Sequence, residues 1–228
     1  MKNSSRTWLS RENAAFARTV PAGSVVLDAG AGEQPYKTLF AHCRYEAADF
    51  ELVDKPYARS TYVCDLAEIP VHDECFDAIL FNQVMEHLPD PFRVLLELRR
   101  VLKPGGRMLC TAPFFYQEHE QPYDFFRYTQ FGWRSLMERA ALEIERLDWM
   151  EGYLGTLAYQ LKTASTALPR RPRDLAPGLA GMLAAPIAIV ARFAFGGLAR
   201  LFYELDERQR LTDRGHPKNY LVIVRRPA

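Results

Sequence analysis

The chain has 228 residues, of which 48% are hydrophobic and 25% are charged, and its formal net charge is +1. This length suffices for one substantial α/β domain, or for one domain that carries a large insertion. The composition excludes a disordered chain, and the small net charge excludes a molecule-wide attraction to nucleic acid or anionic lipid. Binding to either would need a local patch.

The four cysteines form no CxxC pair and have no histidine at zinc-ligand spacing, so we expect no metal site from them. Most of them lie in or beside apolar runs, where buried thiols are common. The first residues lack the apolar core of a signal peptide. We therefore expect reduced thiols and a cytoplasmic protein. The cysteines are Cys43, Cys64, Cys75 and Cys110.

Short β-rich runs alternate with helical stretches along most of the chain. Residues 10–20 predict a first helix with Ser10 as its N-cap. Further helices are expected at residues 91–102, which place apolar side chains on one face and end at Lys103-Pro-Gly-Gly106, and at 129–141. Such alternation predicts a parallel, doubly wound sheet. The expected strands are residues 25–27, 44–48, 61–64, 76–81, 107–111, 142–147 and 220–224.

The residues between the last two strands do not fit this alternation. They contain helical candidates at 152–167 and about 179–203, separated by a basic break at Pro169-Arg-Arg-Pro-Arg173. We interpret the chain as a single domain over residues 1–228, with a helical insertion at about 150–218.

The first strand runs into a glycine-rich turn, Val25-Val-Leu-Asp-Ala-Gly-Ala-Gly32. Glycines at positions 30 and 32 let the backbone approach a ligand that a Cβ would repel, and open α/β sheets bind ligands at the carboxyl ends of their strands. A dinucleotide-binding GxGxxG would have its third glycine at Pro35. The sequence therefore disfavours a nucleotide-dependent oxidoreductase.

Polar residues follow three more of the expected strands. Asp49 comes about 20 residues after the turn, where a carboxylate can bond both hydroxyls of a ribose. Asp65-Leu66 follows the third strand, and Asn82 ends the fourth. A carboxylate at Asp65 suits the amine of an adenine. Their order and spacing indicate a site for an adenosyl group.

These motifs, together with Val84-Met-Glu-His-Leu88 and Leu102-Lys-Pro-Gly-Gly-Arg107, resemble the small-molecule branch of the class I S-adenosylmethionine-dependent methyltransferases, of the methyltransferase domain type 11 kind. The resemblance covers about residues 20–147. It implies a Rossmann-like, mainly parallel seven-stranded sheet with an antiparallel last strand, and S-adenosylmethionine as cofactor. Gln34 departs from the pattern, because family members often have a third glycine there. The cofactor-binding residues that it implies are Asp28, Gly30, Gly32, Asp49, Asp65, Leu66 and Asn82.

Methyl transfer to oxygen requires a base that takes the acceptor's proton. His119 lies in an aromatic-rich loop, residues 114–129, and we expect it to be this base. His87 is the second catalytic candidate, or else a packing residue. Tyr116, Tyr123 and Phe114 are expected to line the acceptor pocket. Arg127 is expected either to hold an anionic group of the substrate or to pair with Asp124.

The insertion contains an uncharged run at residues 175–191. Pro177, Gly178 and Pro186 interrupt it, so we expect no membrane-spanning helix. A lid over the acceptor pocket, a dimer surface and a helix in a membrane interface remain open. The arginines at 170, 171 and 173 suit anionic headgroups. Peripheral contact with the inner membrane face through residues 175–203 is one of these three alternatives.

The leading hypothesis is methyl transfer to a small-molecule or lipid-linked acceptor, at oxygen. The alternatives are a degenerate fold that binds cofactor or a partner without catalysis, and the oxidoreductase. Nucleic acid is not an expected partner, because Asn82 is followed by Gln-Val-Met, whereas adenine amino-methyltransferases have two prolines and an aromatic residue. The sequence leaves the oligomeric state open.

Overall fold

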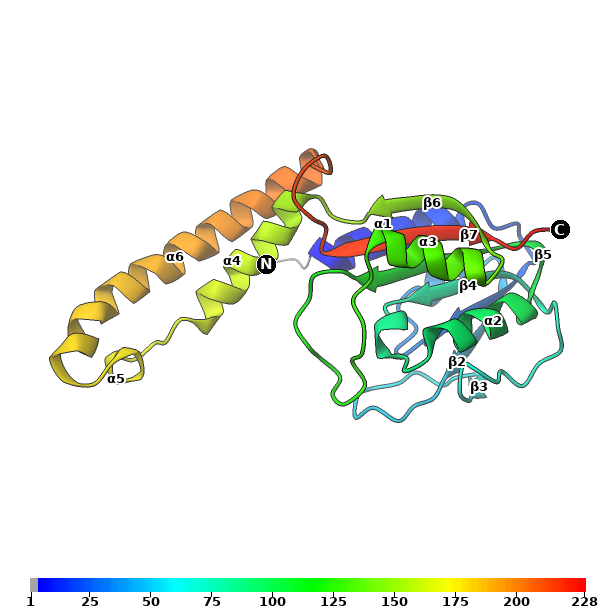
Figure 1. Ribbon diagram of the computed structural model, residues 1–228, viewed down its shortest axis with the longest axis horizontal. Helices are drawn as coiled ribbons and strands as arrows, with labels where there is room; N and C mark the ends of the chain where they lie inside the picture. Colours follow the sequence, from blue (N-terminus) through cyan, green and yellow to red (C-terminus); the bar gives the residue numbers. More distant parts are fainter. Residues whose placement is uncertain (1–3) are drawn as a thin grey trace. The chain divides into compact units, whose positions relative to one another are not determined.

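The computed structural model describes residues 4–228, which contain one seven-stranded sheet flanked by helices (Figure 1). The strand order is β3-β2-β1-β4-β5-β7-β6. Strands β1 to β5 pair in parallel, and β7 is antiparallel to both β5 and β6. The predicted fold class is thereby confirmed. The strands are β1 Val25–Ala29, β2 Arg44–Asp49, β3 Tyr62–Val63, β4 Phe76–Asn82, β5 Leu102–Pro113, β6 Glu143–Trp149 and β7 Asn219–Arg225.

Every predicted helix is present, with the largest boundary error in the first, and the short helices η1, η2 and α5 were not predicted. Helix α1 begins at Ser4, so the prediction of an N-cap at Ser10 was wrong. Leu9 and Phe16, about two turns apart, are both buried, and their shared face continues the helix through position 10. The helices are α1 Ser4–Ala17, η1 Lys37–Phe40, η2 Met85–His87, α2 Pro91–Val101, α3 Gln130–Arg139, α4 Tyr153–Ala167, α5 Pro172–Leu175 and α6 Gly178–Arg208.

Alternate side chains of the sheet enter two hydrophobic cores, as the period-two geometry of strands requires. Leu27 of β1 belongs to the core that α2 and α3 cover, where Trp133 is fully buried. Its neighbour Val26 belongs to the core on the opposite face, against Phe16 of α1 and Phe40 of η1. Because helices cover both faces, the carboxyl ends of the parallel strands remain as the accessible edge of the sheet.

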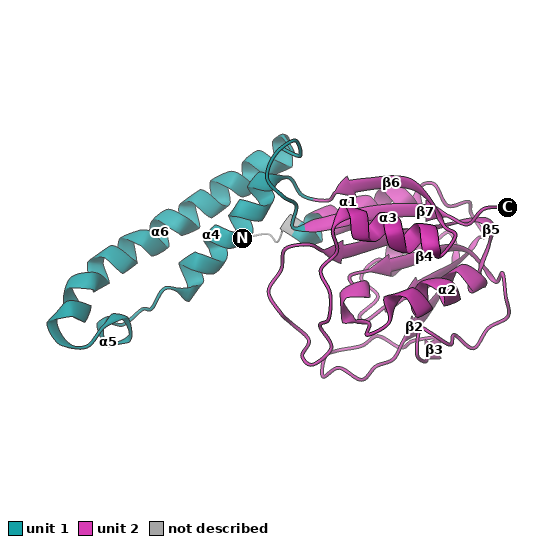
Figure 2. Cartoon of the chain, in the orientation of Figure 1, with its two compact units in different colours: residues 1–7, 151–218 teal, residues 8–150, 219–228 magenta. Residues whose placement is uncertain are grey.

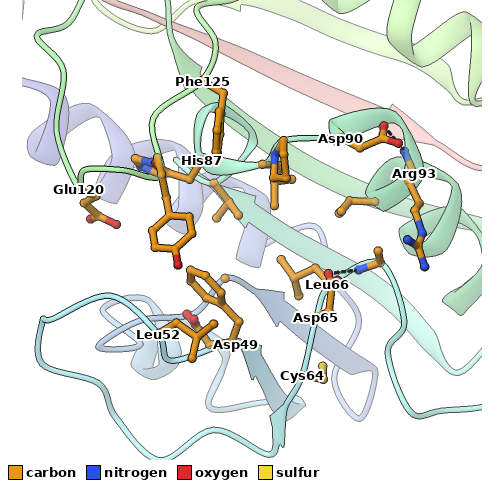
Figure 3. Close-up of a pocket in the computed structure, with 18 of the residues that line it drawn as sticks. Asp49, Leu52, Cys64, Asp65, Leu66, His87, Asp90, Arg93, Glu120 and Phe125 are labelled. Carbon is orange, nitrogen blue, oxygen red and sulfur yellow. Dashed lines mark hydrogen bonds between the residues drawn. The ribbon is translucent and has the colours of Figure 1, made fainter.

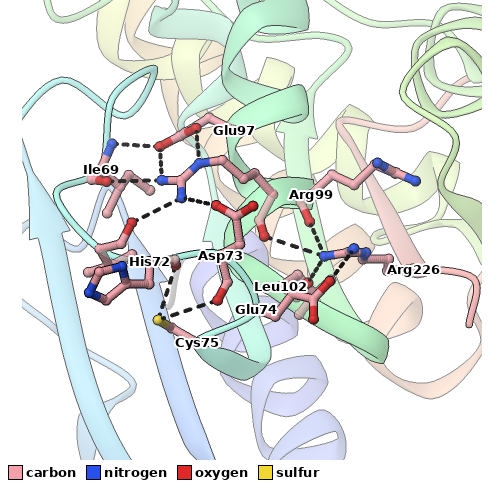
Figure 4. Close-up of polar contacts among 11 residues, drawn as sticks. Ile69, His72, Asp73, Glu74, Cys75, Glu97, Arg99, Leu102 and Arg226 are labelled. Atoms are coloured by element: carbon pink, nitrogen blue, oxygen red, sulfur yellow. Dashed lines mark hydrogen bonds and ion pairs between the residues drawn. The ribbon is translucent and has the colours of Figure 1, made fainter.

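Both ends of α2 are closed by side chains. Asp90 is the N-cap and accepts a hydrogen bond from the Arg93 amide at 3.1 Å. At the other end, the Arg226 guanidinium donates to the carbonyl oxygens of Arg99, Arg100 and Leu102, as Figure 4 shows. Its second nitrogen donates to Glu74 at 2.7 Å. One cation from the end of the chain therefore donates to carbonyls at the helix end, where the intrahelical hydrogen bonds stop.

The segment between β6 and β7 forms a helical hairpin of α4, the short α5 and α6. Residues 151–218, with residues up to Thr7, make one compact unit, and residues 8–150 with 219–228 make the other (Figure 2). The sequence had indicated an interruption at Pro186, but helix α6 continues through this residue. By length and composition, α6 could cross a membrane.

We predict that Arg226→Ala lowers the free energy of unfolding by about 1–3 kcal/mol, because part-buried carbonyls at the end of α2 lose a charged donor. Urea titration followed by tryptophan fluorescence measures this, since Trp8, Trp133 and Trp149 all lie in the unit that contains the sheet. Arg225→Ala is the matched control, because Arg225 makes an exposed ion pair with Glu143. Equal losses in the two variants would contradict the capping role.

Candidate active site

A cavity of about 510 Å³ lies at the carboxyl edge of the sheet. Its lining residues come from the segments that follow β1, β2, β3 and β4, and from residues 120–125 of the aromatic-rich loop. Asp49 and Asp65 lie on one side of it, and His87 and Phe125 lie on the facing side (Figure 3). A cavity of this size accommodates a nucleoside-sized ligand together with part of a second molecule.

Gly30 is required by close packing as well as by its backbone conformation. Its φ is +73°, and a Cβ at this position would lie 2.3 Å from Cγ2 of Val84. Gly32 has a φ of +50° and open space around it. Gln34 has a φ of +54°, so a non-glycine residue occupies a conformation that favours glycine. The Gln34 side chain donates to the Arg59 carbonyl at 2.8 Å, and Gln34 does not line the cavity.

Asp49 ends β2 and presents its carboxylate to the cavity. One oxygen accepts from the Gly32 amide at 2.8 Å and the other from the Glu51 amide at 3.2 Å. A carboxylate has about four acceptor positions, so two amide donors leave room for two hydroxyl donors. The glycine turn and Asp49 thus fix each other in the geometry that a ribose diol requires.

The segment after β3 forms the neighbouring wall. Asp65 and Leu66 both line the cavity, as does Cys64. The Asp65 carboxylate accepts from the Ala67 amide at 2.9 Å, which holds it in a tight turn. A flat apolar base could lie against Leu66 with a carboxylate at its edge. The structure therefore brings Gly30, Asp49, Asp65 and Leu66 together, as their predicted roles require.

Three of the residues predicted to bind the cofactor, Asp28, Gly32 and Asn82, do not line this cavity. Asp28 is buried within β1 and accepts a hydrogen bond from the Tyr45 hydroxyl. Burial raises the pKa of Asp28 to about 7, and the Asp49 charge adds to the rise. Asn82 exchanges side-chain hydrogen bonds with Asn13 of α1 and accepts from Thr111 at 3.2 Å. Asn13 is a polar partner that the sequence reasoning missed, because only the fold brings it to the end of β4.

The aromatic-rich loop is anchored on the 3-10 helix η2. The Glu86 carbonyl accepts from the amides of Phe125 and Phe126, at 2.7 and 3.3 Å, and the Met85 carbonyl accepts from the Tyr128 hydroxyl at 2.9 Å. These bonds hold the loop beside the segment that follows β4. Tyr123 and Phe125 thereby become part of the cavity wall.

Arg127 stabilises this loop from within. It makes two contacts with the Asp124 carboxylate, at 2.6 and 2.8 Å, and donates to the Tyr116 and Gln117 carbonyls. The Arg127 hydrogen bonds lower the pKa of Asp124 to about 2. Of the two expectations for Arg127, the structure has the pair with Asp124. Tyr123 lines the cavity, whereas Tyr116 stacks edge-on against His119 with a ring separation of 4.9 Å.

The two candidate bases are in contact with each other. The His87 and His119 rings are 4.7 Å apart, and His87 lines the cavity whereas His119 does not. Nδ1 of His87 lies 2.5 Å from the Tyr123 carbonyl, so this nitrogen must carry the proton and Nε2 holds the free lone pair. Burial lowers the pKa of His87. His87 is therefore a neutral, oriented base near neutral pH.

Glu86 is the site residue that sequence reasoning missed. Its side chain is fully buried, and within residues 4–228 neither carboxylate oxygen has a hydrogen-bond partner. Burial raises its pKa to about 8, so Glu86 is mostly neutral at pH 7. Its Oε1 lies 3.7 Å from Nε2 of His87. Glu86, His87 and His119 each offer one ligand atom within 4.8 Å of the others, and such a set could hold a divalent cation.

We predict that Glu86→Gln gains stability relative to the wild type as the pH rises from about 5 to about 8. Because the pKa of Glu86 is higher in the folded protein than in the unfolded chain, its protonation adds to the free energy of unfolding. This addition is complete below the unfolded-state pKa and is lost as the pH rises through 8. Glutamine stays neutral, so the difference should grow by up to about 1.4 kcal/mol per pH unit. Urea titrations of both proteins at each pH, with a chelator present, measure it. A constant difference would refute the raised pKa.

Comparisons with known proteins agree with this arrangement. Residues 27–110 match the methyltransferase domain family. The tRNA (carboxymethyluridine(34)-5-O)-methyltransferase of Arabidopsis thaliana is 34% identical over 106 residues, which are 43% of this chain and 26% of that protein. The chain spans between 20% and 45% of the length of three curated relatives that it matches.

Two solved structures with the cofactor or its product share the fold. One is the phosphoethanolamine N-methyltransferase 2 of Haemonchus contortus in complex with S-adenosyl-L-methionine, with a TM-score of 0.57 and 17% sequence identity. The match covers 96% of this chain and 53% of that protein's chain. The 1,6-didemethyltoxoflavin-N1-methyltransferase of Burkholderia thailandensis, with bound S-adenosylhomocysteine, has a TM-score of 0.56 and 15% identity over 96% of this chain and 78% of its own. Residues 27–110 therefore form a methyltransferase domain, the fold is that of the class I methyltransferases, and S-adenosylmethionine is the cofactor that these matches support.

Proposed function

We propose that this chain transfers a methyl group from S-adenosylmethionine to a hydroxyl oxygen of a small or lipid-like acceptor. The observation that supports this proposal is a partly buried, oriented base, His87, on the wall of the same cavity that presents Asp49. An oxygen acceptor requires such a base, because a neutral hydroxyl is a weak nucleophile.

The cofactor's adenosyl half would be held by residues at the strand ends. Asp49 would accept from the ribose hydroxyls, and Asp65 with Leu66 would border the adenine. Gly30 lets the backbone come close to the methionine half. When bound, S-adenosylmethionine supplies an electrophilic methyl group on a sulfonium, and its transfer to a hydroxyl leaves S-adenosylhomocysteine and one proton.

His87 would receive that proton on Nε2. Its Nδ1 already donates to the Tyr123 carbonyl, which fixes both the tautomer and the plane of the ring. The nearby Glu86, mostly neutral at pH 7, adds no full negative charge that would hold His87 in its protonated form. The His119 ring packs edge-on against the His87 ring, with 4.7 Å between the ring centres. The backbone amide of His119 donates to the Asp124 carboxylate at 2.8 Å. His119 is then a positioning residue.

The character of the wall favours a small or lipid-like acceptor over a polyanion. Tyr123 and Phe125 provide aromatic surface. The two long cations of the lining are engaged by carboxylates, Lys55 with Glu120 at 2.7 Å and Arg93 with Glu68. Recognition of a nucleic-acid backbone relies on cations that are available to phosphates.

A screen of separated cell-extract fractions tests the acceptor class. We expect S-adenosylhomocysteine to form with small-molecule or lipid fractions and not with purified RNA. Formation with RNA alone would overturn the acceptor class. Cofactor binding without turnover on any fraction would support the non-catalytic alternative.

We predict that Gly30→Ala abolishes measurable binding of S-adenosylmethionine in titration calorimetry. The added Cβ would meet Val84 at 2.3 Å, so the turn that borders the cavity must move. Gly23→Ala is the matched control: Gly23 also has a positive φ, +82°, but no atom lies within 4 Å of the added Cβ, and it does not line the cavity. Equal effects of the two substitutions would mean that backbone strain alone is responsible.

We predict that His87→Ala lowers kcat by about 10²- to 10⁴-fold while cofactor affinity is retained. His119→Ala should lower kcat by roughly tenfold, and the exposed His72→Ala should leave it unchanged. Because the pKa of His87 is lowered, kcat/KM should fall below about pH 6.5, where the base becomes protonated, and be constant from about pH 7 to about pH 8, where Glu86 ionises beside it. A rate that keeps rising between about pH 8 and 10 would assign the proton transfer to another group.

A further inference from the structure

Helix α6 has an exposed apolar end that the fold leaves uncovered. In α4 and α6, Ser165 donates to the Arg192 carbonyl at 3.0 Å, and a Cβ on Gly196 would lie 3.4 Å from the Ser165 hydroxyl. Helix α4 ends at Ala167, so its last turn lies level with residues 192–196 of α6. Residues 178–191 therefore extend beyond α4 (Figure 1).

The apolar side chains of this end, together with the adjoining Phe193, gather on one broad face. At 100° per residue, they fall within an arc of about 160°, while Gly181 and Ala188, which are buried, lie on the opposite side. Ile187 is 73% exposed and Phe193 is 79% exposed. Single exposed apolar residues are ordinary on a soluble protein, but a continuous face of this kind marks a binding surface. The face, here called the apolar tip, consists of Leu179, Met182, Leu183, Ile187, Ile189, Val190 and Phe193.

A basic turn lies against the same end of α6. A Cβ on Gly181 would lie 2.3 Å from the Pro172 carbonyl oxygen, so residues 170–173 pack directly beside the first turn of the helix. Arg170, Arg171 and Arg173 are exposed there. Across residues 168–203 there are five arginines and one aspartate. An apolar face bordered by arginines matches the acyl chains and phosphate headgroups of an anionic bilayer.

We propose that the apolar tip and its basic turn insert into the interface of an anionic lipid membrane. Insertion is shallow, because Arg192 limits the uncharged part of α6 to residues 178–191, about 21 Å of helix. The hydrocarbon core of a bilayer is about 30 Å thick. This inference is independent of the proposed chemistry, since the apolar tip shares no residue with the cavity lining.

Flotation of the purified full chain with vesicles tests the inference. The chain should float with phosphatidylcholine–phosphatidylglycerol vesicles and much less with phosphatidylcholine alone. The double variant Ile187→Glu/Phe193→Glu should lower the partition coefficient at least about tenfold on mixed vesicles. Arg170→Ala/Arg171→Ala should lower it by about ten- to a hundredfold, on anionic vesicles only.

The matched control is Phe131→Glu on α3, because Phe131 is equally exposed but belongs to the other unit, and it should float like the wild type. Cofactor affinity by calorimetry, which every variant should retain, separates this result from a failure of folding or of the proposed function. A wild type that floats with neither vesicle would overturn the inference. The inference would also be overturned if the wild type formed a concentration-dependent dimer, the double variant Ile187→Glu/Phe193→Glu were monomeric, and no protein floated. The apolar tip would then bind a second copy of the chain.

Discussion

The close approach of the turn after β1 to Val84 is the constraint on which the site depends. No side chain fits at Gly30, whose φ is positive and whose missing Cβ would overlap Val84. Through that contact, the turn after β1 packs on the segment that follows β4. The same turn is held to β2 by the hydrogen bond from the Gly32 amide to the Asp49 carboxylate. Three parallel strands are thus linked at their carboxyl ends through the glycine-rich turn. The cavity is the space that these contacts leave open.

Beside this edge, the chain keeps a buried carboxyl group that contributes no obvious stability. The Glu86 side chain is fully buried. Burial of a polar group is normally offset by hydrogen bonds, but within the described residues neither carboxyl oxygen of Glu86 has a hydrogen-bond partner. Its backbone carbonyl, by contrast, anchors the aromatic-rich loop through Phe125 and Phe126. One residue therefore combines a structural backbone role with an electrostatic position next to His87. Perturbed carboxyl groups of this kind cluster at functional sites.

The fold and the cofactor edge were predictable because both follow from local patterns. Alternating strands and helices fixed the sheet, and residues at strand ends such as Asp49 and Asp65 are placed by the sheet itself. Contacts that depend on the path of a loop were not predictable. His119 was favoured as the base from its aromatic neighbours, whereas the anchoring of the loop on η2 places His87 on the cavity wall. Pro186 likewise suggested a break that α6 does not have.

The most direct test of the account is a crystal structure of the chain with S-adenosylhomocysteine. The account predicts that the ribose hydroxyls lie within hydrogen-bond distance, about 2.5–3.0 Å, of the Asp49 carboxylate. The adenine should lie against Leu66, and the sulfur should face the side of the cavity that His87 lines. A ligand bound elsewhere, or bound here with Asp49 making no contact to it, would contradict the account.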